Sequence, residues 1–219
     1  MLVIIPVVFG GYFETNCYLY APDGSHTLII DPGSDAAKII GIIEKRKLEP
    51  AAIVATHGHP DHILAIGEVA LRFGIPLWVG KGDALMFGRS SKRLYEALVT
   101  PDTEPEIADI INATVEQSKE PDCLLSDGDK LAGFGLTVWE TPGHSPGGIC
   151  LVGDRIAFTD DTLFAGSVGR WDLPGGDETQ LLASIRRLMT LPDETQVYPG
   201  HGPATTIGME RAHNPYITE

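Results

Sequence analysis

The sequence predicts an α/β fold, because short apolar runs and amphipathic helical stretches both recur along the chain. The chain has 219 residues, which is long enough for one such domain and too short to assume two, so we expect a single domain over residues 1–219. Side chains of the types that bind metals follow the ends of several predicted strands. The fold class is justified below element by element.

Strands are predicted where β-branched and apolar residues cluster between Gly, Pro or Asp residues. These runs lie at residues 2–9, 17–20, 27–30, 51–55, 76–79, 136–140, 149–152, 156–159 and 196–198. The first three are separated by turn-rich residues at 10–11 and 22–24. We therefore expect them to be antiparallel neighbours.

Helical periodicity occurs at residues 35–47, 63–73 and 179–189, where apolar residues recur on one face. Ser34 or Asp35 can cap the first helix and Asp177 the third, because their side-chain oxygens accept backbone N–H groups. Gly74 is expected to end the second helix. Residues 81–120 are polar with weak helical patterning, and we expect a helical excursion there, either as surface helices or as a lid over the active site.

The composition excludes several classes of protein. The net charge of −14 and the absence of clustered Lys and Arg argue against nucleic-acid binding. No segment approaches the roughly 18 uninterrupted apolar residues of a membrane span, and no basic region begins the chain. Cys17, Cys123 and Cys150 form no CxxC pair, which fits a reducing compartment. We therefore expect a cytoplasmic protein that binds neither nucleic acid nor membrane.

The segment from Thr56 to His62 contains the densest group of candidate metal ligands, namely His57, His59, Asp61 and His62. It reads THGHPDH and directly follows the apolar run at 51–55. Imidazole nitrogen and carboxylate oxygen both suit Zn²⁺, and imidazole also suits iron. His57 and His59 can point the same way on an extended loop, whereas Asp61 and His62 are better placed to reach a second ion. We interpret the segment as a metal site that can serve two ions.

Further candidate ligands follow three other strands. His144 follows the strand at 136–140, Asp160 and Asp161 follow the strand at 156–159, and His201 follows the strand at 196–198. In α/β sheets, ligand sites gather outside the carboxyl ends of the strands. These loops can therefore converge on one cleft.

With these motifs in this order, the chain resembles the metallo-β-lactamase superfamily, specifically its glyoxalase II-like branch of single-domain hydrolases. The resemblance covers nearly the whole chain and rests on Ile30-Asp31-Pro32-Gly33, the THGHPDH segment, Pro142-Gly143-His144-Ser145-Pro146-Gly147, Asp161-Thr162-Leu163-Phe164 with Gly169-Arg170, and Pro199-Gly200-His201-Gly202-Pro203. It implies an αββα sandwich, in which two mixed β-sheets are flanked by helices and the metals lie at one edge.

The resemblance also implies two divalent metal ions, most simply Zn, with Fe or Mn as alternatives. The implied ligands are His57, His59 and His144 for the first ion, Asp61, His62 and His201 for the second, and Asp161 as a bridge between them. A hydroxide that bridges the two ions would attack the acyl carbonyl of the substrate, and Asp61 would orient this hydroxide and accept its proton.

Three other residues have two interpretations each. Asp31 either starts a turn or accepts a hydrogen bond from a ligand imidazole. Arg170 and Trp171 either line the substrate cleft or pack in its wall or in the core. The sequence alone leaves both interpretations open.

The chain departs from the glyoxalase II pattern at two places. Asp160 stands where the family usually has Gly, and this extra carboxylate either alters the metal preference or points into solvent. It also leaves open whether Asp160 or Asp161 is the bridging residue, although the Thr-Leu-Phe that follows favours Asp161. The sequence extends only 18 residues beyond His201 and lacks the Tyr and the basic helical domain that grip glutathione, so S-lactoylglutathione is expected to be a poor or incidental substrate.

We therefore expect a metal-dependent hydrolase of small-molecule acyl thioesters that acts as a monomer or homodimer. Lactones are the next candidate substrate, and β-lactams are disfavoured because His62 stands where several lactamase types differ. A different reaction class is that of the persulfide dioxygenases, which share the fold and would use one iron held by His57, His144 and Asp161. A non-catalytic role in metal binding is the third interpretation.

Overall fold

The computed structural model describes residues 1–9, 13–98, 103 and 105–218, and the chain forms two compact units. The first unit comprises Met1–Val79 and Asp83–Leu124, and the second comprises Gly80–Gly82 and Leu125–Glu219. The predicted turn at residues 10–11 and residues 99–102 and 104 of the excursion lie outside the described residues. The expectation of a single domain stays a prediction.

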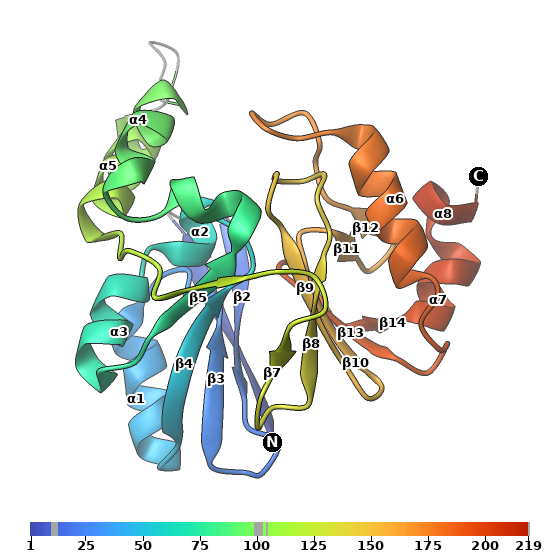
Figure 1. The fold of residues 1–219 in the computed structure, drawn as a ribbon, viewed down its shortest axis with the longest axis horizontal. Coiled ribbons are helices and arrows are strands. Elements are labelled where there is room, and N and C mark those ends of the chain that lie inside the picture. The colour runs from blue at the N-terminus through green and yellow to red at the C-terminus, as the bar shows by residue number, and fades with distance from the viewer. Residues whose placement is uncertain (10–12, 99–102, 104, 219) are drawn as a thin grey trace. The chain divides into compact units, whose positions relative to one another are not determined.

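The first unit contains a mixed six-stranded sheet (Figure 1). Its strand order is β1-β2-β3-β4-β5-β6, formed by Leu2–Phe9, Phe13–Tyr20, His26–Ile30, Glu49–Ala55, Leu77–Gly80 and Cys123–Leu125. Strands β1, β2 and β3 pair antiparallel as predicted, whereas β3, β4 and β5 pair parallel. The parallel pairing brings the carboxyl ends of β3 and β4 to the same edge of the sheet.

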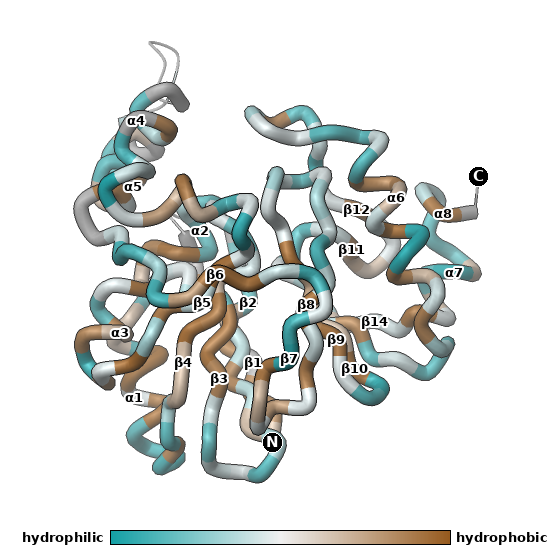
Figure 2. The backbone as a smooth tube through the Cα atoms, viewed as in Figure 1, coloured by the Kyte–Doolittle hydropathy of each residue, from teal (hydrophilic) through white to brown (hydrophobic). Residues whose placement is uncertain are grey.

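The helices of the first unit contribute apolar residues to one buried cluster with the sheet. They are α1 (Ala36–Arg46), α2 (Pro60–Ile63), α3 (Ile66–Phe73), α4 (Gly88–Leu98) and α5 (Pro105–Gln117), with the 3₁₀ helix η1 at Lys81–Met86. Ile39 and Ile43 of α1 are fully buried in one cluster with Ile53 of β4. Burial of each such side chain stabilises the fold by roughly 1.5–3 kcal/mol. Figure 2 shows the matching hydrophobic colouring along β3 and β4.

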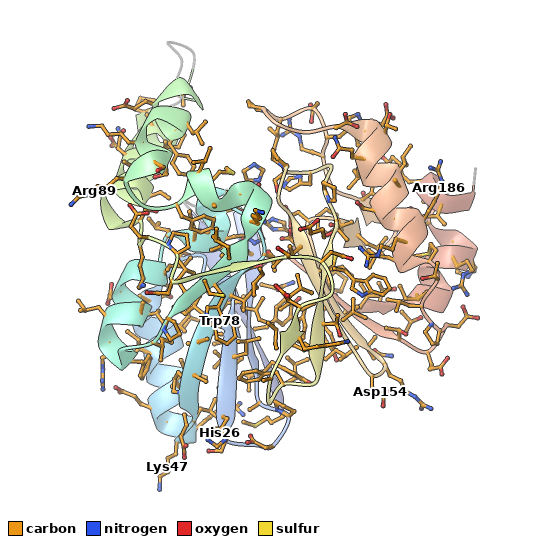
Figure 3. The ribbon with its side chains drawn as sticks, in the orientation of Figure 1. His26, Lys47, Trp78, Arg89, Asp154 and Arg186 are labelled. Atoms are coloured by element: carbon orange, nitrogen blue, oxygen red, sulfur yellow. The ribbon has the colours of Figure 1, made fainter. Side chains whose placement is uncertain are left out.

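The predicted capping residues lie at the ends of three helices. Asp35 accepts a hydrogen bond from the backbone of Lys38, and Asp177 accepts one from Gln180 at the start of α6 (Glu178–Leu188). Gly74 ends α3 with φ 67°, a left-handed conformation that suits glycine. Lys47 ends α1 in the same conformation, and its side chain extends away from the helix (Figure 3).

One predicted helix, at residues 63–73, is divided in the structure. A short helix begins at Pro60, inside the THGHPDH segment, and α3 begins only at Ile66. The backbone N–H of Ala65 donates instead to the carbonyl of Pro32, which interrupts the helical hydrogen bonds. The prediction of one continuous helix from residue 63 was therefore wrong. A hydrogen bond to a distant residue replaces a local helical hydrogen bond at Ala65.

The second unit contains a mixed sheet of order β14-β13-β10-β9-β8-β7. These strands are Thr205–Thr206, Gln196–Pro199, Ile156–Asp160, Ile149–Gly153, Leu136–Glu140 and Lys130–Leu131. The short pair β11 (Leu163–Phe164) and β12 (Ser167–Val168) and the helices α6 (Glu178–Leu188), α7 (Ile207–His213) and α8 (Pro215–Thr218) complete the unit. Leu181 and Ile185 of α6 bury their side chains in a cluster with Val197 of β13. The predicted α/β class, with two mixed sheets flanked by helices, is confirmed.

Among the described residues, no helix combines the length and the hydropathy that a membrane crossing requires.

Candidate functional site

The first group of candidate ligands lies in the loop between β4 and α2. The rings of His57 and His59 have centroids 4.6 Å apart, and those of His57 and His62 lie 4.3 Å apart. The Oδ2 atom of Asp61 lies 3.4 Å from Nε2 of His62. Pro60 at the first helical position turns the chain into α2, since its fixed φ suits a helix start. The loop therefore gathers four ligand-type side chains within the first unit.

Asp31, at the end of β3, fixes this loop from the neighbouring strand. Its Oδ1 atom accepts the backbone N–H of Thr56 at 2.7 Å, and its Oδ2 atom accepts the Thr56 hydroxyl at 2.6 Å. The same Oδ2 atom lies 3.2 Å from Nδ1 of His62. A hydrogen bond at Nδ1 makes Nε2 the ligand atom of the imidazole. Of the two interpretations of Asp31, the contact geometry favours the acceptor of a ligand imidazole.

Two further contacts involve Asp61. The hydroxyl of Thr15, on β2, donates to Oδ2 of Asp61 at 3.1 Å. Gly33 approaches the backbone of Asp61 so closely that a Cβ atom at residue 33 would clash with the Asp61 carbonyl. Thr15 was not predicted as a site residue, because a buried Thr in a strand belongs to no recognisable motif.

The second group of candidate ligands lies in the second unit and centres on Asp161. Its Oδ2 atom lies 3.5 Å from Nε2 of His144 and 3.4 Å from Nε2 of His201. The three residues follow β8, β10 and β13, as the sequence predicted. Nδ1 of His144 donates to the backbone carbonyl of Arg170 at 2.8 Å, which again directs Nε2 toward a ligand role. The Asp161 carboxylate thus lies within reach of two imidazoles, and its role as a bridging ligand stays a prediction.

Asp160 differs from its neighbour in conformation and in contacts. It has φ 53°, in the left-handed region where Gly is favoured and where Asp is tolerated better than most residues. Its side chain is 3% exposed, so the interpretation that it points into solvent was wrong. Its carbonyl accepts the backbone N–H of Gly200 at 3.0 Å, which joins β10 to the loop that carries His201. The positive φ explains why Gly suits this position.

Arg170 and Trp171 make contacts with their own unit. The guanidinium of Arg170 is exposed and forms an ion pair with Asp172 at 2.9 Å, and this hydrogen-bonded pair raises the pKa of Arg170. The ring of Trp171 lies 6.4 Å from that of Tyr216, edge to face, beside the apolar cluster of the second unit. Their role in substrate binding stays a prediction.

The donor set fits divalent metals. It consists of imidazole nitrogens and carboxylate oxygens, the ligand types of zinc and of non-haem iron, and protein acceptors orient two of its imidazoles. Each unit brings part of the set together by itself.

Comparisons with known proteins agree with these features. The sequence pattern of the metallo-beta-lactamase superfamily matches residues 10–201. The Haemophilus influenzae protein named hydroxyacylglutathione hydrolase GloC is 36% identical over 220 residues, which cover 98% of this chain and 96% of that protein.

Two crystal structures are similar to the chain. The BLEG-1 B3 metallo-beta-lactamase is 36% identical with a TM-score of 0.82, over 100% of both chains. The protein TTHA1623, in a di-iron-bound form, is 35% identical with a TM-score of 0.75, over 97% of this chain and 99% of that one.

Proposed function

This chain belongs to the metallo-beta-lactamase superfamily and is a metallo-hydrolase, and we propose that it hydrolyses acyl thioesters. The observation that carries the metal-dependent part of the proposal is the position of Asp161 between His144 and His201, because a carboxylate in this position can serve two metal ions. The similarity to a hydroxyacylglutathione hydrolase over nearly the full chain supports a thioester as the substrate.

The proposed ligands come from both groups described above. His57, His59 and His144 would hold the first ion, Asp61, His62 and His201 would hold the second, and Asp161 would serve both. Zinc is the first choice, and iron and manganese are alternatives, because the same ligand types accept all three metals. TTHA1623, which binds two irons, supports a site for two ions without naming the metal here.

The metal ions and the residues of the chain have different roles in the proposed hydrolysis. Divalent ions, when bound, lower the pKa of water toward 7 and polarise a carbonyl group, which is the chemistry that acyl hydrolysis needs at neutral pH. Asp61 orients the attacking water and accepts its proton, while Thr15 holds the Asp61 carboxylate by donating to Oδ2. Asp31 keeps the imidazole of His62 in the orientation that presents Nε2.

An activity screen on samples of known metal content tests this proposal. The substrates are a 2-hydroxyacylglutathione, simpler acyl thioesters, a lactone, a β-lactam and glutathione persulfide with O₂ uptake. We expect thioester hydrolysis that rises with metal occupancy and is lost in His57→Ala. Rapid O₂ consumption with one iron per chain and no thioester hydrolysis would show a persulfide dioxygenase instead, and turnover of only the lactone or the β-lactam would change the substrate class.

A further inference from the structure

Three residues of the excursion, Asp83, Met86 and Tyr95, lie against Gly58 of the THGHPDH segment within the first unit. The Oδ2 atom of Asp83, in η1, accepts the backbone N–H of Gly58 at 3.1 Å. The hydroxyl of Tyr95, in α4, donates to the backbone carbonyl of Gly58. The backbone N–H and the backbone carbonyl of Gly58 are therefore each hydrogen-bonded to a side chain of the excursion.

Both side chains are buried, so no solvent can replace these hydrogen bonds if they are lost. Asp83 is 1% exposed and Tyr95 is 0% exposed. A buried donor or acceptor that loses its partner costs roughly 1–3 kcal/mol, so the backbone at Gly58 has a strong preference for this one position. Met86 adds a third contact, since a Cβ atom at residue 58 would clash with its side chain. Only glycine allows this approach.

The start of α4 is itself fixed, so Tyr95 has a defined position. The backbone N–H of Gly88 donates to the hydroxyl of Ser118 at 2.8 Å, and that of Arg89 donates to Oε1 of Glu120 at 2.8 Å. These side chains follow α5 and satisfy N–H groups that a helix start leaves without helical partners. Arg89 extends outward from α4 (Figure 3), whereas Ser91 and Tyr95, one turn apart, lie on its buried face.

We propose that Asp83 and Tyr95 are positioning residues for the metal ligands on either side of Gly58. Together they fix the peptide groups that join Gly58 to His57 and to His59, and so they set the direction in which both imidazoles leave the backbone. The excursion thus acts as a clamp on the metal-binding loop. This inference rests on the proposed function in one respect, namely that His57 and His59 bind metal.

Metal affinity and the spectrum of bound cobalt test the clamp. Zinc affinity is measured by competition with a chelator, and the visible absorption of the Co²⁺-substituted protein reports the ligand geometry. We expect Tyr95→Phe to weaken zinc binding at least about tenfold, in the range seen when groups that orient metal ligands are removed, and to shift the cobalt bands. Ser91→Ala is the matched control, because Ser91 is a buried hydroxyl of the same helix that donates to Gly88 and not to the metal-binding loop.

Asp83 provides an independent pair of variants. Asp83→Asn keeps an oxygen that can accept the Gly58 N–H, whereas Asp83→Ala removes it. We expect the asparagine variant to retain most of the zinc affinity and the alanine variant to lose about as much as Tyr95→Phe. If Tyr95→Phe does not fold, the two Asp83 variants alone test whether the excursion positions the metal ligands.

The outcomes separate the clamp from the proposed function. The clamp is overturned if Tyr95→Phe and Asp83→Ala bind zinc and cobalt as the wild type does, or if Ser91→Ala loses as much affinity as they do. A wild-type protein that binds no metal overturns both proposals. A wild-type protein that binds metal and hydrolyses no thioester overturns the proposed substrate alone, and the zinc and cobalt measurements still decide on the clamp.

Discussion

The hydroxyl of Thr15 donates a 3.1 Å hydrogen bond to the Oδ2 atom of Asp61, so a strand residue holds the carboxylate that we propose as proton acceptor. Thr15→Val removes the hydroxyl and keeps the shape of the side chain. A hydrogen bond to a charged group contributes roughly 1.5–3 kcal/mol, so we expect kcat for thioester hydrolysis to fall about tenfold or more. Thr15→Ser keeps the hydroxyl and should retain most of the activity. Equal losses in the two variants would contradict a role for the hydroxyl.

The adjacent carboxylates Asp160 and Asp161 should respond differently to the same substitution. Asp161→Asn is expected to lose bound metal and to lower kcat/KM by roughly a hundredfold or more, because the ions supply several kcal/mol of transition-state stabilisation. Asp160→Asn should keep its metal, and Asp160→Gly should also fold, since φ 53° suits glycine. Metal analysis and kinetics on the three proteins check this. The reverse order of effects would assign the bridge to Asp160.

The cysteines should differ in reactivity. Burial raises the pKa of Cys150 to about 12 and that of Cys17 well above its ordinary value, whereas Cys123 is exposed. The thiolate is the form that reacts with alkylating reagents. We expect iodoacetamide at pH 8 to label the folded protein at Cys123 alone and the denatured protein at every cysteine, as read by mass spectrometry. Labelling of Cys150 in the folded protein would show that its surroundings open.

The ion pair between Asp127 and Arg187 should make the stability of the second unit depend on pH. The hydrogen bonds from Arg187, at 2.5 and 3.1 Å, and then that from the backbone of Glu140, lower the pKa of Asp127. A lowered pKa gives stability that is fully present above the ordinary value of about 4 and is lost as the pH falls through the lowered value.

Thermal unfolding of Asp127→Asn between pH 2 and 7 tests this dependence. The Tm difference from the wild type should be largest near neutral pH and should shrink below about pH 4. Asp154→Asn makes the same change of charge at an exposed turn and serves as the control. A Tm difference that is the same at every pH would mean that the Asp127 carboxylate does not act through its charge.

Local patterns were sufficient to predict the strands that carry the candidate ligands. The strand at 136–140 matches β8 in both bounds, and the ligand-type residues follow the expected strand ends, because alternation and turn residues are local properties. The contacts of Thr15, Asp83 and Tyr95 could not be predicted, since each joins segments far apart in sequence. The sequence left two alternatives open for Asp160, because its burial depends on the strands around it.

Gly169 restricts where the loop after β12 can be redesigned. A Cβ atom at this position would clash with the backbone carbonyl of Asp161, so any substitution there would displace the residue between His144 and His201. Arg170 and Trp171 follow immediately, and the guanidinium of Arg170 is exposed. A mutant library that tests the proposed role of Arg170 in substrate binding should therefore vary residue 170 and keep residue 169 as glycine.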